Sequence, residues 1–104
     1  MDNENWVEVG AVIDNEIKEK AGVKYLADIY QEIVKGEYFP IIKSDGKSNK
    51  VEFRTKEGII YRGYLYARAI KLSDNLYLPA WVSTKNIFDD DYFDLSAVTE
   101  WRYL

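Results

Sequence analysis

Residues 59–72 read Ile59-Ile-Tyr-Arg-Gly-Tyr-Leu-Tyr-Ala-Arg-Ala-Ile-Lys-Leu72, a run rich in β-branched and aromatic residues that predicts a β-strand. Turn signals bound the run, with Glu57-Gly58 before it and Ser73-Asp-Asn75 after it. The run is about twice as long as an ordinary strand, and Gly63 within it predicts a bend or bulge. Long bent strands serve two sheets or turn the corner of a small barrel. We therefore expect a strongly curved sheet around this strand.

The segments that flank this run predict two neighbouring strands. Residues 50–56 alternate in polarity, which places Val51, Phe53 and Thr55 on a buried face and the charged residues in water. Residues 76–82 predict the next strand, with the even-numbered side chains pointing inward. Tight turns join these segments, so the strands are expected to be antiparallel.

Three weaker signals complete the strand region. Residues 37–43 predict a first strand, and Pro40 restricts it to the edge of the sheet. Asp45-Gly46 is the strongest hairpin signal in the chain. Residues 83–94 are expected to form a loop, and residues 95–104 a helical turn that leads into a short last strand.

The N-terminal part of the chain predicts helices. Residues 6–20 fit both the period of a strand and that of a helix, and we expect a helix over part of them, with Asp14 as a candidate N-cap. Residues 23–35 predict a clearer helix that ends at Lys35-Gly36. Its apolar stripe consists of Val23, Leu26, Ile29 or Tyr30, and Ile33.

These elements predict an α+β fold in which an N-terminal helix, or helices, packs on a strongly bent sheet of four or five antiparallel strands. No repeat or linker divides the 104 residues, so residues 1–104 are expected to form a single domain. From Lys50 to Leu104, the order of strand, acidic-Gly turn, long Gly-bent strand, further strand and closing turn-plus-strand resembles the small SH3-like and Sm-like barrels. The resemblance is one of pattern, so it implies a fold and assigns no functional residue.

The composition restricts the chemistry of the chain. Cysteine and histidine are both absent, which removes disulfides, thiolate zinc sites and the commonest general base and nitrogen ligand. No phosphate loop, dinucleotide fingerprint, nucleophile elbow or zinc motif occurs. We expect a protein that is not an enzyme and that has neither a cofactor nor a metal site.

The sequence also carries expectations about location. No apolar run approaches the ~18–20 residues that a membrane-spanning helix needs, and the first five residues are acidic and polar. We therefore expect a complete cytoplasmic chain with no membrane partner.

The first candidate surface is the acidic segment near the C-terminus. Its residues are Asp89, Asp90, Asp91, Tyr92, Phe93 and Asp94. The segment lacks the ligand spacing and terminal Glu of a calcium loop, although its carboxylates would suit a hard cation. Its acids and aromatic residues fit the basic surface of a protein partner. The structural alternative is a solvated loop whose aromatic rings enter the core.

The second candidate surface combines basic residues with tyrosines. Its residues are Arg54, Lys56, Arg62, Tyr64, Tyr66 and Arg68. Residues 43–71 hold eight bases and three acids, while the rest of the chain holds six bases and fifteen acids. On one sheet face, these arginines and tyrosines would contact phosphates and stack on bases of a single strand. The structural alternative is that the tyrosines pack beneath the helices while the arginines pair with nearby acids.

These observations favour a non-enzymatic protein-binding module. Nine tyrosines and three tryptophans exceed what a core of this size needs, and aromatic residues are enriched at interfaces. The small, acidic chain, free of Cys and His, resembles phage and mobile-element inhibitors that occupy the nucleic-acid channels of host enzymes. We expect residues 89–94 to bind a basic protein partner. The alternatives are a nucleic-acid-binding small barrel and a homodimer formed through an edge strand at Pro40 or an aromatic surface.

Overall fold

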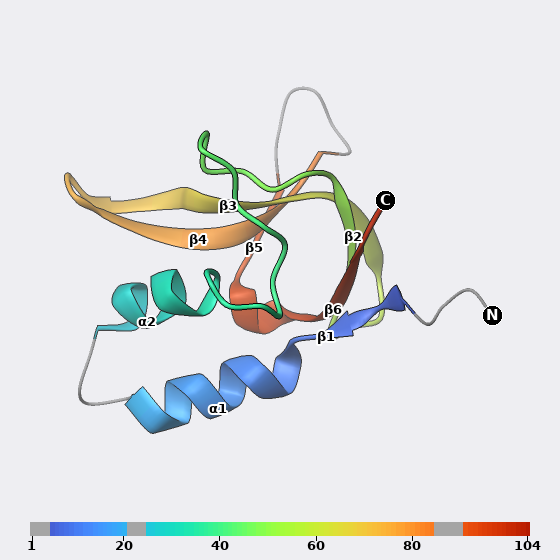
Figure 1. Cartoon of the computed structure of the whole chain (residues 1–104), viewed down its shortest axis with the longest axis horizontal. Helices are drawn as coiled ribbons and strands as arrows, with labels where there is room; N and C mark the ends of the chain where they lie inside the picture. Colours follow the sequence, from blue (N-terminus) through green and yellow to red (C-terminus); the bar gives the residue numbers. More distant parts are fainter. Residues whose placement is uncertain (1–4, 21–24, 85–90) are drawn as a thin grey trace.

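The structure is a computed structural model that describes residues 5–20, 25–84 and 91–104. It has two helices and one antiparallel sheet of six strands (Figure 1). The helices are α1 (Gly10–Lys20) and α2 (Leu26–Ile33). The strands, in the order in which they lie in the sheet, are β1 (Val7–Glu8), β6 (Val98–Tyr103), β2 (Val51–Thr55), β3 (Ile60–Ser73), β4 (Leu76–Ser83) and β5 (Asp91–Phe93). A 3-10 helix, η2 (Leu95–Ala97), precedes β6. The α+β class is confirmed, with more strands than the sequence predicted.

The sheet curls around one hydrophobic core. Phe93 on β5 lies with its ring centroid 4.6 Å from that of Tyr61 on β3 and 5.6 Å from that of Phe53 on β2, although β5 pairs only with β4 among the described strands. Trp81, which is fully buried, contacts Phe53 at 5.3 Å between ring centroids. The ladders between the described strands leave the sheet open, because β1 and β5 are not paired with each other. We call the face that carries Phe53 and Trp81 the inner face and the opposite one the outer face.

The helices add their apolar sides to the same core. Ile13 of α1 and Ile29 of α2 are buried in one cluster with Trp81, and Figure 1 shows both helices on one side of the sheet. Helix α1 begins at Gly10, so Asp14 lies inside the helix and the prediction that it is the N-cap is wrong. No helix in the described residues is long and apolar enough to cross a membrane.

Helix α2 is confirmed in type, and its buried face differs from the predicted stripe. Leu26 is 49% exposed, whereas Ala27, Ile29, Tyr30 and Ile33 are buried. Leu26 is the first residue of the helix. Val23 lies outside the described residues. The helix ends at Ile33, close to the predicted stop, and the N–H of Gly36 donates to the carbonyl of Ile33 at 2.9 Å.

Strand β3 is confirmed, but the predicted role of Gly63 is not. Gly63 pairs in regular register with Val51 on β2 and with Ser83 on β4. The irregularities in β3 fall between Tyr66 and Ile70 and between Lys71 and Ser73. A Cβ at position 63 would lie only 1.7 Å from the carbonyl oxygen of Val82. The glycine is therefore required by close contact between strands rather than by a bulge.

The predicted inward side chains of β4 are wrong at Ala80 and Val82, whereas Leu78 packs against the core as predicted. Trp81 lies opposite Leu65 on the inner face, while Val82 lies opposite Tyr64 on the outer face. Every residue from Pro79 to Ser83 is buried, so the strand lacks the polar alternation that would have identified its inner face.

The predicted edge strand over residues 37–43 is also wrong. The segment forms turns, and its one described bridge joins Ile42 to Ser48. Two hydrogen bonds join the segment to β6. The indole of Trp101 donates to the carbonyl of Tyr38 at 2.8 Å, and the Ile41 N–H donates to the Tyr103 hydroxyl at 2.9 Å. Pro40 is fully buried, so it marks no exposed sheet edge.

The turn predictions hold. Gly46 and Gly58 have positive φ values of 86° and 87°, the backbone conformation that favours glycine at a turn. The helical turn and last strand after residue 95 appear as η2 and β6. The predicted loop over residues 83–94 contains β5, a short strand that sequence reasoning missed.

Candidate binding surface

The strand register places side chains from all six described strands in rows on the outer face. Residues directly opposite each other on antiparallel strands point to the same face. One row across β1, β6, β2 and β3 consists of Glu8, Glu100, Arg54 and Ile60. The next row, across β6, β2 and β3, consists of Arg102, Glu52 and Arg62. A further row, across β3, β4 and β5, consists of Tyr64, Val82 and Tyr92.

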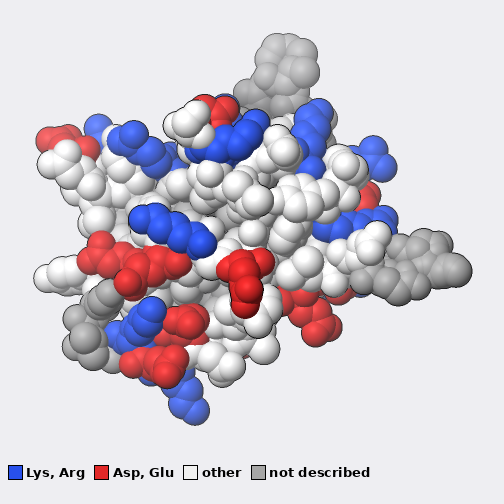
Figure 2. All heavy atoms as spheres, viewed as in Figure 1, with Lys and Arg blue, Asp and Glu red and all other residues white. Residues whose placement is uncertain are grey.

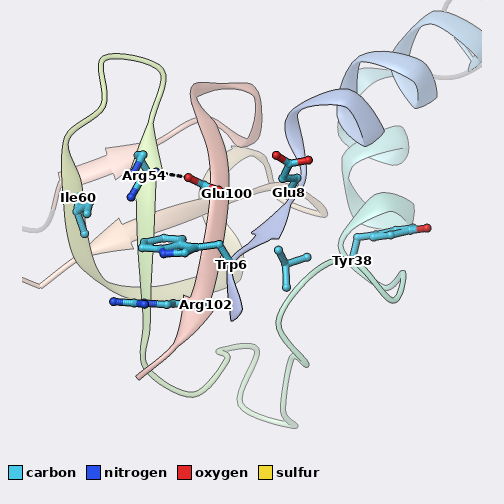
Figure 3. A pocket seen from close by; sticks show the side chains of 8 residues that line it. Trp6, Glu8, Tyr38, Arg54, Ile60, Glu100 and Arg102 are labelled. Carbon is cyan, nitrogen blue, oxygen red and sulfur yellow. Dashed lines mark hydrogen bonds and ion pairs between the residues drawn. The ribbon is translucent and has the colours of Figure 1, made fainter. Parts of the chain in front are cut away.

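An arginine–tryptophan cluster lies at the centre of the first two rows. Trp6, which immediately precedes β1, has the guanidinium carbons of Arg54 and Arg102 each 4.6 Å from its ring centroid. Figure 3 shows the indole between these two arginines. Guanidinium groups interact favourably with the faces of an indole ring. We use the name Arg–Trp cluster for Trp6, Glu52, Arg54, Arg62, Glu100 and Arg102.

Carboxylates hold the arginines of the cluster in place. Arg54 forms an ion pair with Glu100, drawn as a dashed line in Figure 3. Arg102 Nε donates to Glu52 Oε1 at 2.8 Å, and Arg62 Nε lies 3.5 Å from Glu52 Oε2. Glu52 is only 8% exposed, and a carboxylate so nearly buried is stable only when charged donors satisfy it. The prediction that the even-numbered residues of β2 face water therefore fails at Glu52.

Four members of the Arg–Trp cluster, Trp6, Arg54, Glu100 and Arg102, line a hollow of about 760 Å³. Glu8, Tyr38 and Ile60 also line it, and they come from three separate segments of the chain (Figure 3). Tyr38 is 47% exposed and Ile60 is 45% exposed, so apolar surface is available beside the charged groups.

A pair of tyrosines extends the outer face along β3. The rings of Tyr64 and Tyr66 meet edge to face with centroids 6.2 Å apart, and Lys47 Nζ lies 5.3 Å and 5.4 Å from the two centroids. The backbone fixes this arrangement, since Lys47 forms a bridge with Tyr66 and the Ala67 N–H donates to the Gly46 carbonyl at 2.9 Å.

The structure separates the members of the predicted acidic site. Asp89 and Asp90 lie outside the described residues. Asp91 and Tyr92 are on β5, and Tyr92 is 51% exposed on the outer face, in the same row as Tyr64. Phe93 points the other way and packs on Tyr61 in the core.

Asp94 forms hydrogen bonds within the fold. Its Oδ2 accepts from the Tyr30 hydroxyl at 2.9 Å and from the Ser96 N–H at 3.0 Å, so it caps η2 and ties that turn to α2. Burial, followed by the hydrogen bond to Asp94, raises the pKa of Tyr30 to about 12. The described part of the acidic segment therefore contributes Tyr92 to the outer face, whereas Asp91, opposite Ser83, belongs to a row of the inner face.

The predicted Arg/Tyr site is brought together in part. Arg54, Arg62, Tyr64 and Tyr66 share the outer face with one another. Arg68 lies in the irregular part of β3, with its guanidinium carbon 4.2 Å from the Tyr77 ring centroid. Lys56 lies in the turn after β2 and is exposed.

Sequence reasoning missed four members of the cluster, namely Trp6, Glu52, Glu100 and Arg102. Glu100 and Arg102 alternate with Trp101, a pattern that indicates a strand with one charged face. Trp6 carries no such signal, because its neighbours become known only from the pairing of β1 with β6.

On the side of the molecule drawn in Figure 2, basic and acidic side chains are distributed unevenly between the sheet and the helices. Figure 2 shows basic side chains gathered over the strands and acidic side chains gathered over the helices. Among the residues that the structure describes, no three carboxylates gather closely enough to hold a metal ion. Comparisons of the chain with models of protein families, with curated proteins and with solved structures returned no match. Inference about function therefore rests on the geometry of the outer face.

Proposed function

We propose that the chain is a non-enzymatic module that binds a protein partner through the outer face of its sheet. The observation that supports this most directly is Trp6 stacked between Arg54 and Arg102 on that face. Tryptophan, tyrosine and arginine are the residues most often found at the energetic centres of interfaces. Because the two arginines are already ordered by Glu100 and Glu52, binding a partner costs little of their side-chain entropy.

The partner that we propose is a basic protein surface, such as the nucleic-acid channel that a phage or mobile-element inhibitor would block. The net charge of −4 and the acidic segment 89–94, which reaches the outer face at Tyr92, support this choice. The strand order β6-β2-β3-β4-β5, with η2 before β6, supports an SH3-like or Sm-like arrangement of this part of the chain.

Affinity capture from the native host tests the proposed function. The immobilised chain should retain a protein after nuclease treatment, and Trp6→Ala should reduce the retained amount at least tenfold. Tyr25→Ala is the matched control, since Tyr25 is 80% exposed and lies beside α2. A thermal melt shows that each variant is folded. Equal retention by Trp6→Ala and wild type would refute the proposal.

The second candidate function is binding of single-stranded nucleic acid. The placement of Lys47 over Tyr64 and Tyr66, next to Arg62 with its 73% exposed side chain, supports it. The ion pairs of Arg54 and Arg102 oppose it, because these two guanidiniums are already neutralised.

A gel shift with short single-stranded DNA and RNA at ~50 mM salt tests this alternative. Nucleic-acid binding predicts a shifted band that weakens as salt is added and is lost in the double variant Arg62→Ser, Tyr66→Ser. The protein-binding proposal predicts that no shifted band appears with wild type.

A further inference from the structure

The ion pairs on the outer face are unevenly shared. The face holds three arginines and three carboxylates, yet Glu52 contacts both Arg102 and Arg62, and Glu100 contacts Arg54. Glu8 is exposed, and no cation among the described residues forms an ion pair with it. One corner of the face therefore carries a negative charge at Glu8, and the opposite corner carries a positive charge at Arg62.

Glu8 also occupies an unfavourable register position. The ladder places it directly opposite Glu100, and like charges that face each other across a strand pair repel. Helix α1 begins two residues after Glu8, and the positive end of its dipole favours a carboxylate there. The two effects are similar in size and opposite in sign, so the carboxylate contributes little to folding.

We propose that the hollow receives an arginine side chain of the protein partner, with Glu8 as the carboxylate that pairs with it. This inference rests on the proposed function. The guanidinium would meet the Glu8 carboxylate, and its planar face suits the exposed ring of Tyr38. Ile60 lies in the same row as Glu8 but three strand spacings away, so it lines the opposite end of the hollow and would not contact this side chain.

The charge pattern also orients the partner. Glu8 on β1 and Arg62 on β3 are separated by three strand spacings, or about 14 Å across the sheet. A partner that places an arginine at Glu8 must place an acidic or neutral group at Arg62. Such a pattern sets the register of a complex more than its affinity.

An NMR titration with the peptide acetyl-Gly-Arg-Gly-amide tests the inference without the partner. The Trp6 indole N–H and the Glu8 amide should shift and saturate at millimolar peptide, and Glu8→Gln should weaken binding at least threefold. Glu57→Gln is the matched control, because Glu57 is exposed in the turn between β2 and β3. The peptide acetyl-Gly-Glu-Gly-amide should leave both signals in place.

Two outcomes would overturn the inference: no saturating shift at Trp6 and Glu8, or equal affinity in Glu8→Gln and wild type. Either would leave the proposed function standing if capture of the partner still depends on Trp6. Equal capture of the partner by Trp6→Ala and wild type would refute the proposed function, whatever the result of the peptide titration.

Discussion

At the scale of single residues, the hydrogen bond between Tyr30 and Asp94 gives the fold a predictable dependence on pH. The raised pKa of Tyr30, about 12, means that the unfolded chain releases this proton near pH 10 while the folded chain keeps it. The contribution of Tyr30 to stability is therefore complete below pH 10 and declines as the pH rises toward 12.

Tyr30→Phe tests this bond. The free energy of unfolding at pH 7 should fall by about 1–2 kcal/mol, since Asp94 keeps its bond from the Ser96 N–H. Urea denaturation at pH 7 and pH 11 measures the effect. The variant should lose less stability than wild type between these two pH values, because it lacks the Tyr30 hydroxyl whose pKa is raised in the folded state. Identical losses of stability in the two proteins would show that folding does not raise the pKa of Tyr30.

Gly63 provides a second test at the residue scale. In Gly63→Ala, the added methyl group would lie 1.7 Å from the Val82 carbonyl oxygen, so β3 and β4 must separate. We expect the free energy of unfolding to fall by about 3 kcal/mol or more, as for severe overpacking. Gly58→Ala is a useful comparison, because its cost arises from a positive φ of 87° without any steric contact. A smaller loss at Gly63 than at Gly58 would contradict the close contact.

At the scale of elements, one side chain connects α2 to the long hairpin of β3 and β4. Gln31 Nε2 donates to the carbonyl of Ala67 at 2.7 Å and to the carbonyl of Tyr77 at 3.0 Å. Ala67 lies in the stretch between Tyr66 and Ile70 where the regular ladder is interrupted, and Tyr77 pairs with Lys71 just beyond it. The amide thus binds one carbonyl on each strand of the hairpin.

Gln31→Glu should destabilise the hairpin more than Gln31→Met, because a carboxylate would face two carbonyl oxygens. We expect the free energy of unfolding to fall by about 2–3 kcal/mol in Gln31→Glu and by about 1–2 kcal/mol in Gln31→Met. Hydrogen exchange should show faster exchange of the amides of residues 70–78 in both variants. Unchanged exchange there, with a loss of stability elsewhere, would place the role of Gln31 outside the hairpin.

The elements also show how far sequence reasoning extends. Strand β3 and the turns at Gly46 and Gly58 follow from local residue preferences, so they were predictable. Residues 37–43 have the composition of a strand, but bonds from Trp101 and Tyr103 fix them as turns. The two hydrogen bonds join residues that are 63 and 62 positions apart in the sequence. No local pattern reports contacts of that range.

The candidate site was predictable only in part for the same reason. Arg54, Arg62, Tyr64 and Tyr66 were identified because they alternate along two adjacent strands. Trp6 and Arg102 join them only through the pairing of β6 with β1 and β2, which connects both ends of the chain to its middle.

At the scale of the whole molecule, the two candidate surfaces of the sequence become neighbours. Tyr92 of the acidic segment and Tyr64 of the Arg/Tyr group lie in one row of the outer face, separated by Val82. On the side drawn in Figure 2, acidic side chains are more frequent over the helices and basic side chains over the strands. A partner of the outer face would meet a surface that is mixed in charge and rich in aromatic rings.

Site-specific photo-crosslinking in the native host tests the central claim, that the outer face is the binding surface, most directly. Benzoylphenylalanine would replace Tyr92 or Tyr66 on the outer face and, as the control, Tyr25 beside α2, which is 80% exposed. Our account predicts one nuclease-resistant protein adduct from positions 92 and 66 and none from position 25. The same adduct from position 25 but not from the outer face would contradict it.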